Sequence, residues 1–272
     1  MNAPEKTLHT LILPDIQASP DHRELAINQV GVRGLRYPLQ LIDAAGEVHA
    51  TVATLSMTVG LLPSVKGTHM SRFVEIMEAQ DSALSLLDMK ALFNRMKQRL
   101  EATTGRIEFD FPYFIRKQAP VSGVYSLIDI DAGVTLTGHA IGQTEVTLKV
   151  VVPVTSLCPC SKEISDYGAH NQRSHITISA TLRDEETLNL EDLVCIAEQE
   201  ASCEVFGLLK RPDEKWVTER AYDNPKFVED LVRDIALRLK QEPRIQRWSV
   251  SSENFESIHN HSAYALIEGS NT

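Results

Sequence analysis

The sequence predicts an α+β fold, built from two similar modules that each place helices on one face of an antiparallel sheet. The chain has 272 residues, and 43% of them are hydrophobic, which is enough to bury a large core. Each half of the chain runs from two strand-like segments through helical patterns to two further strand-like segments. Helices that connect one hairpin to another are typical of an antiparallel sheet with helices on one face.

The first 25 residues are polar and contain Pro4, Pro14 and Pro20, so residues 1–25 are predicted to form an extended or mobile arm. The first module is expected over residues 26–144. It begins with strands at 36–42 and 51–61 around a turn at 44–47, followed by a short helix at 71–78.

A clearer helix follows, because apolar residues recur there at the spacing of one helix face. Asp88 is its expected N-cap and Gly105 its expected stop. The apolar positions are Met89, Leu92, Phe93, Met96 and Leu100. Strands are then predicted at 106–116, 121–130 and 134–137.

The second module, expected over residues 145–272, repeats this order. Asn189 is the expected cap of one helix, and Asn224 with Pro225 the expected start of another. The first helix carries Leu193, Ile196, Ala197 and Ala201, and the second carries Val228, Leu231, Val232, Ile235 and Leu239. Strands are predicted at 147–155, 175–182, 248–252 and 262–267. Such a sheet has open edges, which closure into an oligomer would pair.

Composition argues against several classes of function. The formal net charge of −10 disfavours broad nucleic-acid binding, which needs a basic face. The longest apolar runs fall well short of the roughly 20 residues that span a bilayer, and no secretory signal pattern opens the sequence. Four cysteines in a chain of this length, without an export signal, indicate reduced thiols rather than a disulfide scaffold. We therefore expect a cytoplasmic protein.

The segment from Ser156 to Glu163 is the most unusual in the sequence, because it contains Cys158-Pro159-Cys160. In an extended chain, residues two apart point to the same side, so both thiols are expected to face one cavity. Burial of both thiols in a core is the alternative. The polar neighbours favour a site, and the spacing differs from the C-x-x-C of zinc ribbons.

His259 and His261 form a second pair with the same spacing, and Glu253 and Glu256 come shortly before them. A lone His-x-His is more often a pair of surface or hydrogen-bonded histidines. The two acids favour a site here, since carboxylates orient imidazoles that bind metals. We therefore predict a metalloenzyme whose site is built from the cysteine segment and this histidine segment.

Three further segments carry residues suited to chemistry. In a polar loop, His170 is a candidate ligand or acid–base group, whereas His175 is expected to be structural. The segment 210–215 indicates either a solvated turn, or a carboxylate from Glu214 beside cations that attract phosphate. The segment 66–72 is a basic lead into a helix, where phosphates can bind.

Several strings of the sequence together resemble GTP cyclohydrolase I of type B, the prokaryotic form of that enzyme. The resemblance covers most of the chain, and its most specific strings are CPCSKEIS followed by GAHNQRSH, and ENFESIHNHS. Other matching strings are NQVGVRGLRYPL, KGTHMSRF, GLLKRPDEK and NPKFVEDLVRD. The resemblance implies tandem tunnelling-fold modules in an oligomeric barrel, and a homotetramer whose sites lie at subunit interfaces.

The resemblance also implies a reaction and a metal. GTP and water would give 7,8-dihydroneopterin triphosphate and formate, the first step toward tetrahydrofolate. One divalent metal per site, Zn, Mn or Fe, would be held by Cys158, Glu214 and His259, with His170 joining or approaching it. A metal can lower the pKa of bound water from about 15.7 to about 7, which suits attack on C8 of guanine.

The remaining roles follow from the same resemblance. Glu229 would anchor the purine, while Cys160 and His261 would transfer protons or position groups. The candidates for binding the triphosphate are Lys66, His69, Arg72, Lys210 and Arg211.

Two other interpretations stay open at this point. A tunnelling-fold nitrile reductase acting on a deazaguanine would use a Cys nucleophile and a nicotinamide cofactor, but the chain lacks the E-S-K-S-x-K signature of that family. A non-catalytic, zinc-stabilised interaction protein would have a closed four-ligand site and would unfold on chelation.

Overall fold

The computed structural model describes residues 15, 17, 19–43, 45–139, 144–183 and 187–271. Its centre is an antiparallel sheet with the strand order β1-β2-β3-β4-β5-β6-β8-β9, and β7 pairs with β5 outside this path. The strands are β1 (Ile27–Ile42), β2 (Val48–Leu61), β3 (Gly105–Gln118), β4 (Tyr125–Gly138), β5 (Thr144–Leu157), β6 (Asn171–Leu182), β7 (Cys203–Glu204), β8 (Ile245–Phe255) and β9 (Ser262–Ser270).

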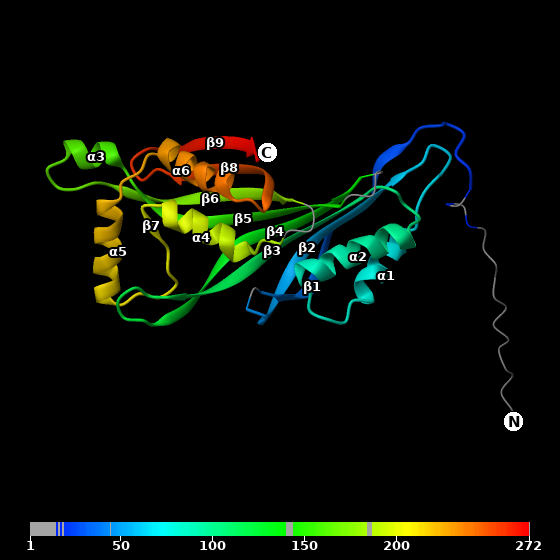
Figure 1. Cartoon of the computed structure of the whole chain (residues 1–272), viewed down its shortest axis with the longest axis horizontal. Coiled ribbons are helices and arrows are strands. Elements are labelled where there is room, and N and C mark those ends of the chain that lie inside the picture. The colour runs from blue at the N-terminus through cyan, green and yellow to red at the C-terminus, as the bar shows by residue number, and fades with distance from the viewer. Residues whose placement is uncertain are drawn as a thin grey trace, which may run out of the picture.

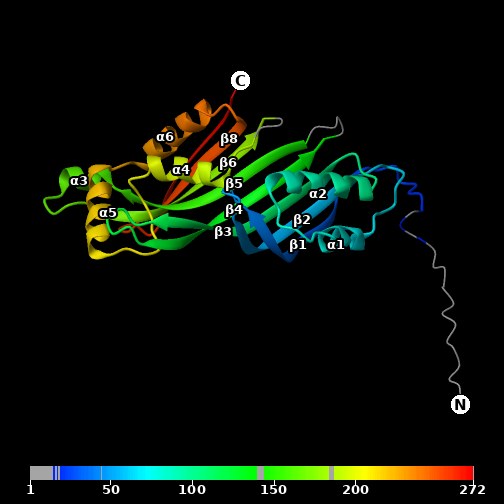
Figure 2. The ribbon, with the colours of Figure 1, turned by 60° about the horizontal axis from the view of Figure 1, so that its bottom comes forward.

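Four helices cover one face of this sheet, as Figures 1 and 2 show. They are α1 (Met70–Glu78), α2 (Leu86–Arg99), α4 (Leu190–Glu200) and α6 (Val228–Gln241). Alternate residues along most of the strands are buried beneath them, and the side chains of strands and helices form one apolar cluster. Phe73, Phe93 and Phe109 are among its largest fully buried members. The predicted antiparallel sheet with helices on one face is therefore confirmed.

Two further helices, α3 (Pro159–Ile164) and α5 (Arg211–Asp223), lie together at one end of the sheet (Figure 1). Lys162 of α3 connects them, because its Nζ donates a hydrogen bond of 2.5 Å to the carbonyl of Tyr222 in α5. The same ammonium lies 4.2 Å from the centre of the Tyr222 ring. Neither helix was among the predicted elements.

The predicted repeat of element order is present in the chain. Two strands, two helices and two strands occur first as β1, β2, α1, α2, β3 and β4, and then as β5, β6, α4, α6, β8 and β9. The second series also contains α3, β7 and α5. Because β4 pairs with β5, the sheet is continuous across the expected boundary, and the division into modules at 144 and 145 stays a prediction.

Parts of two predicted features lie outside the described residues. These parts are most of the arm at 1–25, and Ala44 of the first turn. Gly46 in that turn has a φ of 83°, a conformation that favours glycine, and the hairpin of β1 and β2 around it confirms the predicted pair of strands.

The ends of α2 differ from the prediction. Ser85, not Asp88, is the N-cap, and Asp88 is the third helical residue of a capping box. The Asp88 carboxylate accepts the Ser85 N–H at 2.9 Å, while Ser85 Oγ accepts the Asp88 N–H at 3.2 Å. The helix ends at Arg99, so Gly105 is not its stop and instead begins β3.

Two other boundaries also need correction. Asn224 caps the C-terminal end of α5, and α6 begins three residues after Pro225, at Val228. The predicted strands at 121–130 and 134–137 are one strand, β4, because Val121 lies in the turn between β3 and β4. In the part of the chain that the structure describes, no helix is long and apolar enough to cross a membrane.

Candidate functional site

The segment that carries the two predicted thiols is a short helix rather than an extended chain. Cys158 is the N-cap of α3 and Pro159 is its first residue. Proline suits this position, because its fixed φ matches the first turn and the helix needs no N–H there. The predicted extended geometry is therefore wrong, although Cys158 and Cys160 still line one pocket.

Ser161 fastens the loop that brings Cys158 close to His170. Its hydroxyl donates to the Cys158 carbonyl at 3.1 Å and accepts the His170 N–H at 3.2 Å. The Cys158 N–H donates in turn to the His170 carbonyl at 3.2 Å. These three bonds fix the backbone at both ends of the segment, so the thiol and the imidazole are held on the same side of the pocket.

His259 and His261 lie in the turn between β8 and β9. Their rings are stacked, with centres 5.2 Å apart and planes inclined by 15°. Both side chains are exposed to solvent. By contrast, His175 lies within β6 and packs edge-on against Phe255, which agrees with the structural role expected for it.

Glu229 stands in the first turn of α6 and is exposed. The segment before it is tied to the sheet, because the Lys226 N–H donates to the carbonyl of Leu157 at 3.2 Å. The Lys226 ammonium is paired with Asp234 at 2.7 Å, so its charge is already balanced within the fold. The start of α6 is thereby placed beside the end of β5 and the thiol segment.

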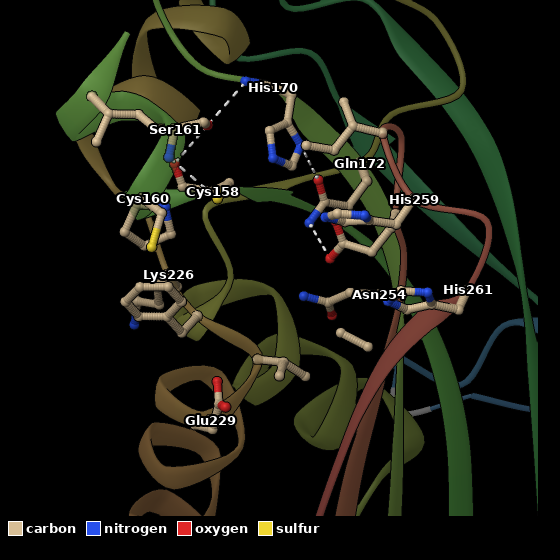
Figure 3. Close-up of a pocket in the computed structure, with 17 residues that line it drawn as sticks. Cys158, Cys160, Ser161, His170, Gln172, Lys226, Glu229, Asn254, His259 and His261 are labelled. Carbon is tan, nitrogen blue, oxygen red and sulfur yellow. Dashed lines mark hydrogen bonds between the residues drawn. The ribbon is translucent and has the colours of Figure 1, made fainter.

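These elements enclose a pocket of about 450 Å³. Apolar side chains such as Ile164, Phe227 and Ile258 form part of its wall. Figure 3 shows the cysteines on one side, the His259 and His261 imidazoles on the other, and Glu229 pointing into the space from α6. Six predicted site residues line this pocket: Cys158, Cys160, His170, Glu229, His259 and His261.

The pocket also contains polar residues that the sequence analysis did not single out. Gln172 and the buried Asn254 project from the adjacent strands β6 and β8, and Lys226 precedes α6. Gln172 lies two residues after the predicted His170, just inside β6, and this closeness in sequence was the one available signal. Nothing in the pattern around Asn254 or Lys226 distinguishes them from ordinary strand and loop residues.

Glu214, Lys210 and Arg211 lie on α5 and do not line this pocket. Lys210 is the N-cap of α5, Arg211 its first residue, and all three side chains are exposed. The helix start is held by Asp213, a fully buried carboxylate that accepts hydrogen bonds from the Lys210 N–H at 2.8 Å and from Ser122 in the β3–β4 turn. The segment is thus the beginning of a helix, not the solvated turn that was one of its two interpretations.

Lys66, His69 and Arg72 lie at the start of α1, as the prediction of a basic lead into a helix requires. His69 is the N-cap of α1, and its Nε2 lies 3.1 Å from Asp15 Oδ2. Figures 1 and 2 place α1 and the α3–α5 pair at opposite ends of the sheet. Within one chain, these three residues are therefore not neighbours of the pocket.

The donor types around the pocket suit a divalent metal, since thiolate and imidazole bind such ions. However, no three Cys, His, Asp or Glu side chains of the described residues come close enough together to hold one ion. Cys158, His170 and His259 line the same pocket without forming such a group, and Glu214 lies outside it. A single chain does not assemble the predicted centre, and the ligand set stays a prediction.

The two remaining cysteines lie outside the pocket. Cys203 is buried, and burial raises the pKa of its thiol to about 12, so it is a neutral core residue. Cys195 is exposed on α4, where its sulfur accepts a hydrogen bond from Gln199.

The chain is similar along its length to proteins that share one family name. Residues 13–265 match the family model described as type I GTP cyclohydrolase folE2. The chain is 66% identical over 271 residues to GTP cyclohydrolase FolE2 1 of Dechloromonas aromatica (strain RCB), with 100% of both chains covered. It is 60% identical over 258 residues to GTP cyclohydrolase FolE2 of Azoarcus sp. (strain BH72), with 94% of both chains covered.

The fold also resembles solved structures of distant sequence. Uricase from Arthrobacter globiformis superposes with a TM-score of 0.51 at 10% identity, covering 90% of this chain and 93% of the uricase. At this identity the likeness concerns the fold alone. It supports the predicted tunnelling-type architecture.

Proposed function

Because the chain belongs to the type I GTP cyclohydrolase FolE2 family, we propose that it converts GTP and water to 7,8-dihydroneopterin triphosphate and formate. The observation that carries this proposal is the pocket in which a thiol, imidazoles and a carboxylate meet at the end of the sheet. The reaction would be the first step toward tetrahydrofolate.

Glu229 is the proposed anchor for guanine. A carboxylate that faces the guanine N1–H and exocyclic amine accepts two hydrogen bonds, and an ionised acceptor makes such bonds stronger. A site built to satisfy these donors rejects bases that lack them, because its own polar group would then stay unpaired. Glu229 suits this role because its carboxylate enters the pocket beside the apolar wall formed by Phe227.

The proposed chemistry begins at C8 of guanine and ends with loss of formate. Ring opening requires protons to be delivered and removed, and a positioned side chain typically accelerates such a transfer by about 10²–10⁴-fold. Cys160, His170 and His261 line the pocket and are the proposed proton-transfer or positioning groups. Hydroxide at neutral pH is the chemistry that a bound divalent ion would supply.

The proposed ligands of that ion are Cys158, Glu214 and His259, with His170 joining or approaching it, and the ion would be Zn, Mn or Fe. Bringing Glu214 to the others requires α5 to move or a neighbouring subunit to contribute. We therefore include in the proposal a homotetramer with its sites at subunit interfaces. Such an assembly could also bring the triphosphate candidates of α1 to a pocket on another chain: Lys66, His69 and Arg72.

Two alternatives are weaker. A non-catalytic interaction protein would hold its zinc in a closed four-ligand site, whereas the chain matches a family of enzymes. A nitrile reductase would require a nicotinamide cofactor and the signature that the sequence lacks. The family match favours the cyclohydrolase.

The test is to strip the purified protein of metal, add Zn, Mn or Fe separately, and assay formate and pterin release from GTP. Release of both products with at least one metal is the expected result. Oxidation of NADPH with a deazaguanine nitrile, without formate release from GTP, would instead identify the reductase. A chelated sample that loses activity but keeps its circular dichroism spectrum would exclude a purely structural metal.

A further inference from the structure

A chain of hydrogen bonds runs through the pocket from His170 to the loop after β8. The His170 Nδ1 lies 3.1 Å from Gln172 Oε1, and the Gln172 Nε2 donates to Glu256 Oε1 at 3.4 Å. Figure 3 shows Gln172 between the imidazole and the far wall of the pocket. All three residues line the cavity, so the contacts belong to the site and not to the distant core.

The chemistry of the groups decides which atom donates and which accepts in each of these hydrogen bonds. A carboxylate can only accept hydrogen bonds, so Glu256 requires the NH₂ end of the Gln172 amide to face it. The amide oxygen then faces His170 and needs a donor there. A neutral imidazole carries its proton on one nitrogen, and the acceptor at Nδ1 selects the form with the proton on Nδ1. The lone pair is left on Nε2.

A second neighbour of His170 Nδ1 does not decide whether this nitrogen donates or accepts. Ser257 Oγ lies 3.2 Å from His170 Nδ1, and a hydroxyl can either donate or accept. Ser257 therefore fits both forms of the imidazole and selects neither. Among the described residues, Gln172 is the partner of His170 that distinguishes between them.

We propose that Gln172 is a positioning residue, which uses its contact with Glu256 to hold His170 with the proton on Nδ1 and the Nε2 lone pair turned to the pocket. Figure 3 shows the second ring nitrogen of His170 on the side of Cys158. A histidine held in this way offers a ready acceptor or ligand atom at Nε2, because its ring orientation and its tautomer are both set beforehand. The consequence for turnover rests on the proposed function, whereas the position of the proton does not.

Heteronuclear NMR of the full-length chain, labelled with ¹⁵N-histidine, tests the proton position directly. Spectra at an alkaline pH of about 8.5, where ordinary histidines are neutral, separate protonated from unprotonated ring nitrogens. A His170→Asn sample assigns the signal, and spectra before and after chelation exclude an effect of bound metal. We expect the proton on Nδ1 in both conditions. A proton on Nε2 would overturn the proposal without any variant.

Variants then identify the residue responsible. Gln172→Leu removes the acceptor and should give a mixture of both forms. Ser257→Ala is the matched control, because it removes the other neighbour and should leave the proton on Nδ1. A mixture in Ser257→Ala, or an unchanged spectrum in Gln172→Leu, would assign the role to Ser257 instead.

Turnover of GTP provides the second measurement. Gln172→Leu should lower kcat by about 10–100-fold with little change in KM, as is typical when a group that orients a histidine of the site is lost. Glu229→Gln should instead raise KM, because it weakens a binding contact. If the wild-type protein does not turn over GTP, the proposed function fails while the NMR result stands. If it does, and Gln172→Leu has normal kcat, the positioning role fails alone.

Discussion

Cys158 and Cys195 are both accessible thiols, yet their surroundings give them different chemistry. Cys158 caps α3 inside the pocket, where its sulfur accepts the Ser161 N–H at 3.4 Å and its backbone is bonded to His170. Cys195 lies on the surface of α4 and contacts Gln199. Exposure alone does not separate the two, so the pocket that surrounds Cys158 is what supports its proposed role.

Replacing Cys158 with alanine should abolish formate release from GTP. Activity should fall by more than about 100-fold, because removing a proposed metal ligand lowers activity more than removing a residue that only orients a ligand. The fold should change little, since the side chain is only half-buried and caps a helix of one and a half turns. The measurements are formate release, bound metal and the melting temperature.

Cys195→Ala is the matched control for this experiment, because it removes a thiol from the same chain outside the pocket. It should retain wild-type turnover and metal content. Near-normal turnover in Cys158→Ala would refute the ligand role of that residue.

At the scale of the element, α5 is held differently from the other helices. Of its thirteen residues, Asp213 and Ala221 alone are buried. Asp213 accepts hydrogen bonds from the N–H groups of Val121 and Ser122 at 2.8 Å each, from the Ser122 hydroxyl at 2.6 Å, and from Lys210. One carboxylate therefore joins the start of α5 to the turn between β3 and β4.

This arrangement predicts a dependence of stability on pH. Burial by itself would raise the pKa of Asp213, but the hydrogen bonds from Ser122, Lys210 and Val121 outweigh it and hold the pKa well below its usual range. A carboxyl whose pKa is lower in the folded state stabilises the fold above its unfolded pKa of about 3.9. That stabilisation is lost as the pH falls toward the folded value.

The urea unfolding midpoint of Asp213→Asn should accordingly lie below that of the wild type at pH 6. The difference between the two should shrink as the pH is lowered below about 4, where the unfolded carboxyl is protonated. Asp223→Asn, which changes an exposed carboxyl in the same helix, should track the wild type throughout. A constant difference from pH 6 to pH 3 would contradict the lowered pKa.

The same helix shows why part of the fold could not be predicted from the sequence. α2 and α6 bury apolar residues at helical spacing, so the periodicity of the sequence predicts both helices. α5 buries a carboxylate and an alanine, and so it has no apolar stripe. α3 is six residues long and begins with a proline between two cysteines, a pattern that an extended chain would also fit.

The candidate site could likewise be predicted only in part from the sequence. Its cysteine and histidine segments were predicted because such residue types at close spacing are rare and chemically distinctive. Gln172 was not predicted, because a single amide side chain in a strand forms no recognisable sequence pattern. Its role is suggested only by its partners in the structure, His170 and Glu256. The distance of Glu214 from the pocket depends on how α5 is anchored, and that is a property of the β3–β4 turn far away in sequence.

At the scale of the whole molecule, the two faces of the sheet differ in how they are covered. One face is covered by helices and apolar. On the other, exposed charged residues lie in register across the strands, with Arg36, Asp110 and Lys149 in one row. β1 and β9 end the sheet, and each pairs with one strand among the described residues. Two open edges suit closure of the sheet into a barrel through contacts between chains.

The proposed homotetramer leads to a prediction about mass and dilution. Four chains of 30.3 kDa should give a particle of roughly 120 kDa in light scattering coupled to size-exclusion chromatography. If sites form between subunits, formate release per milligram of protein should fall when dilution separates the chains, because each lone chain then lacks part of its site. Reconcentration of the same sample should restore it. A 30 kDa particle with the same specific activity at every dilution would show instead that one chain completes the site by itself, and that α5 must move to bring Glu214 to the pocket.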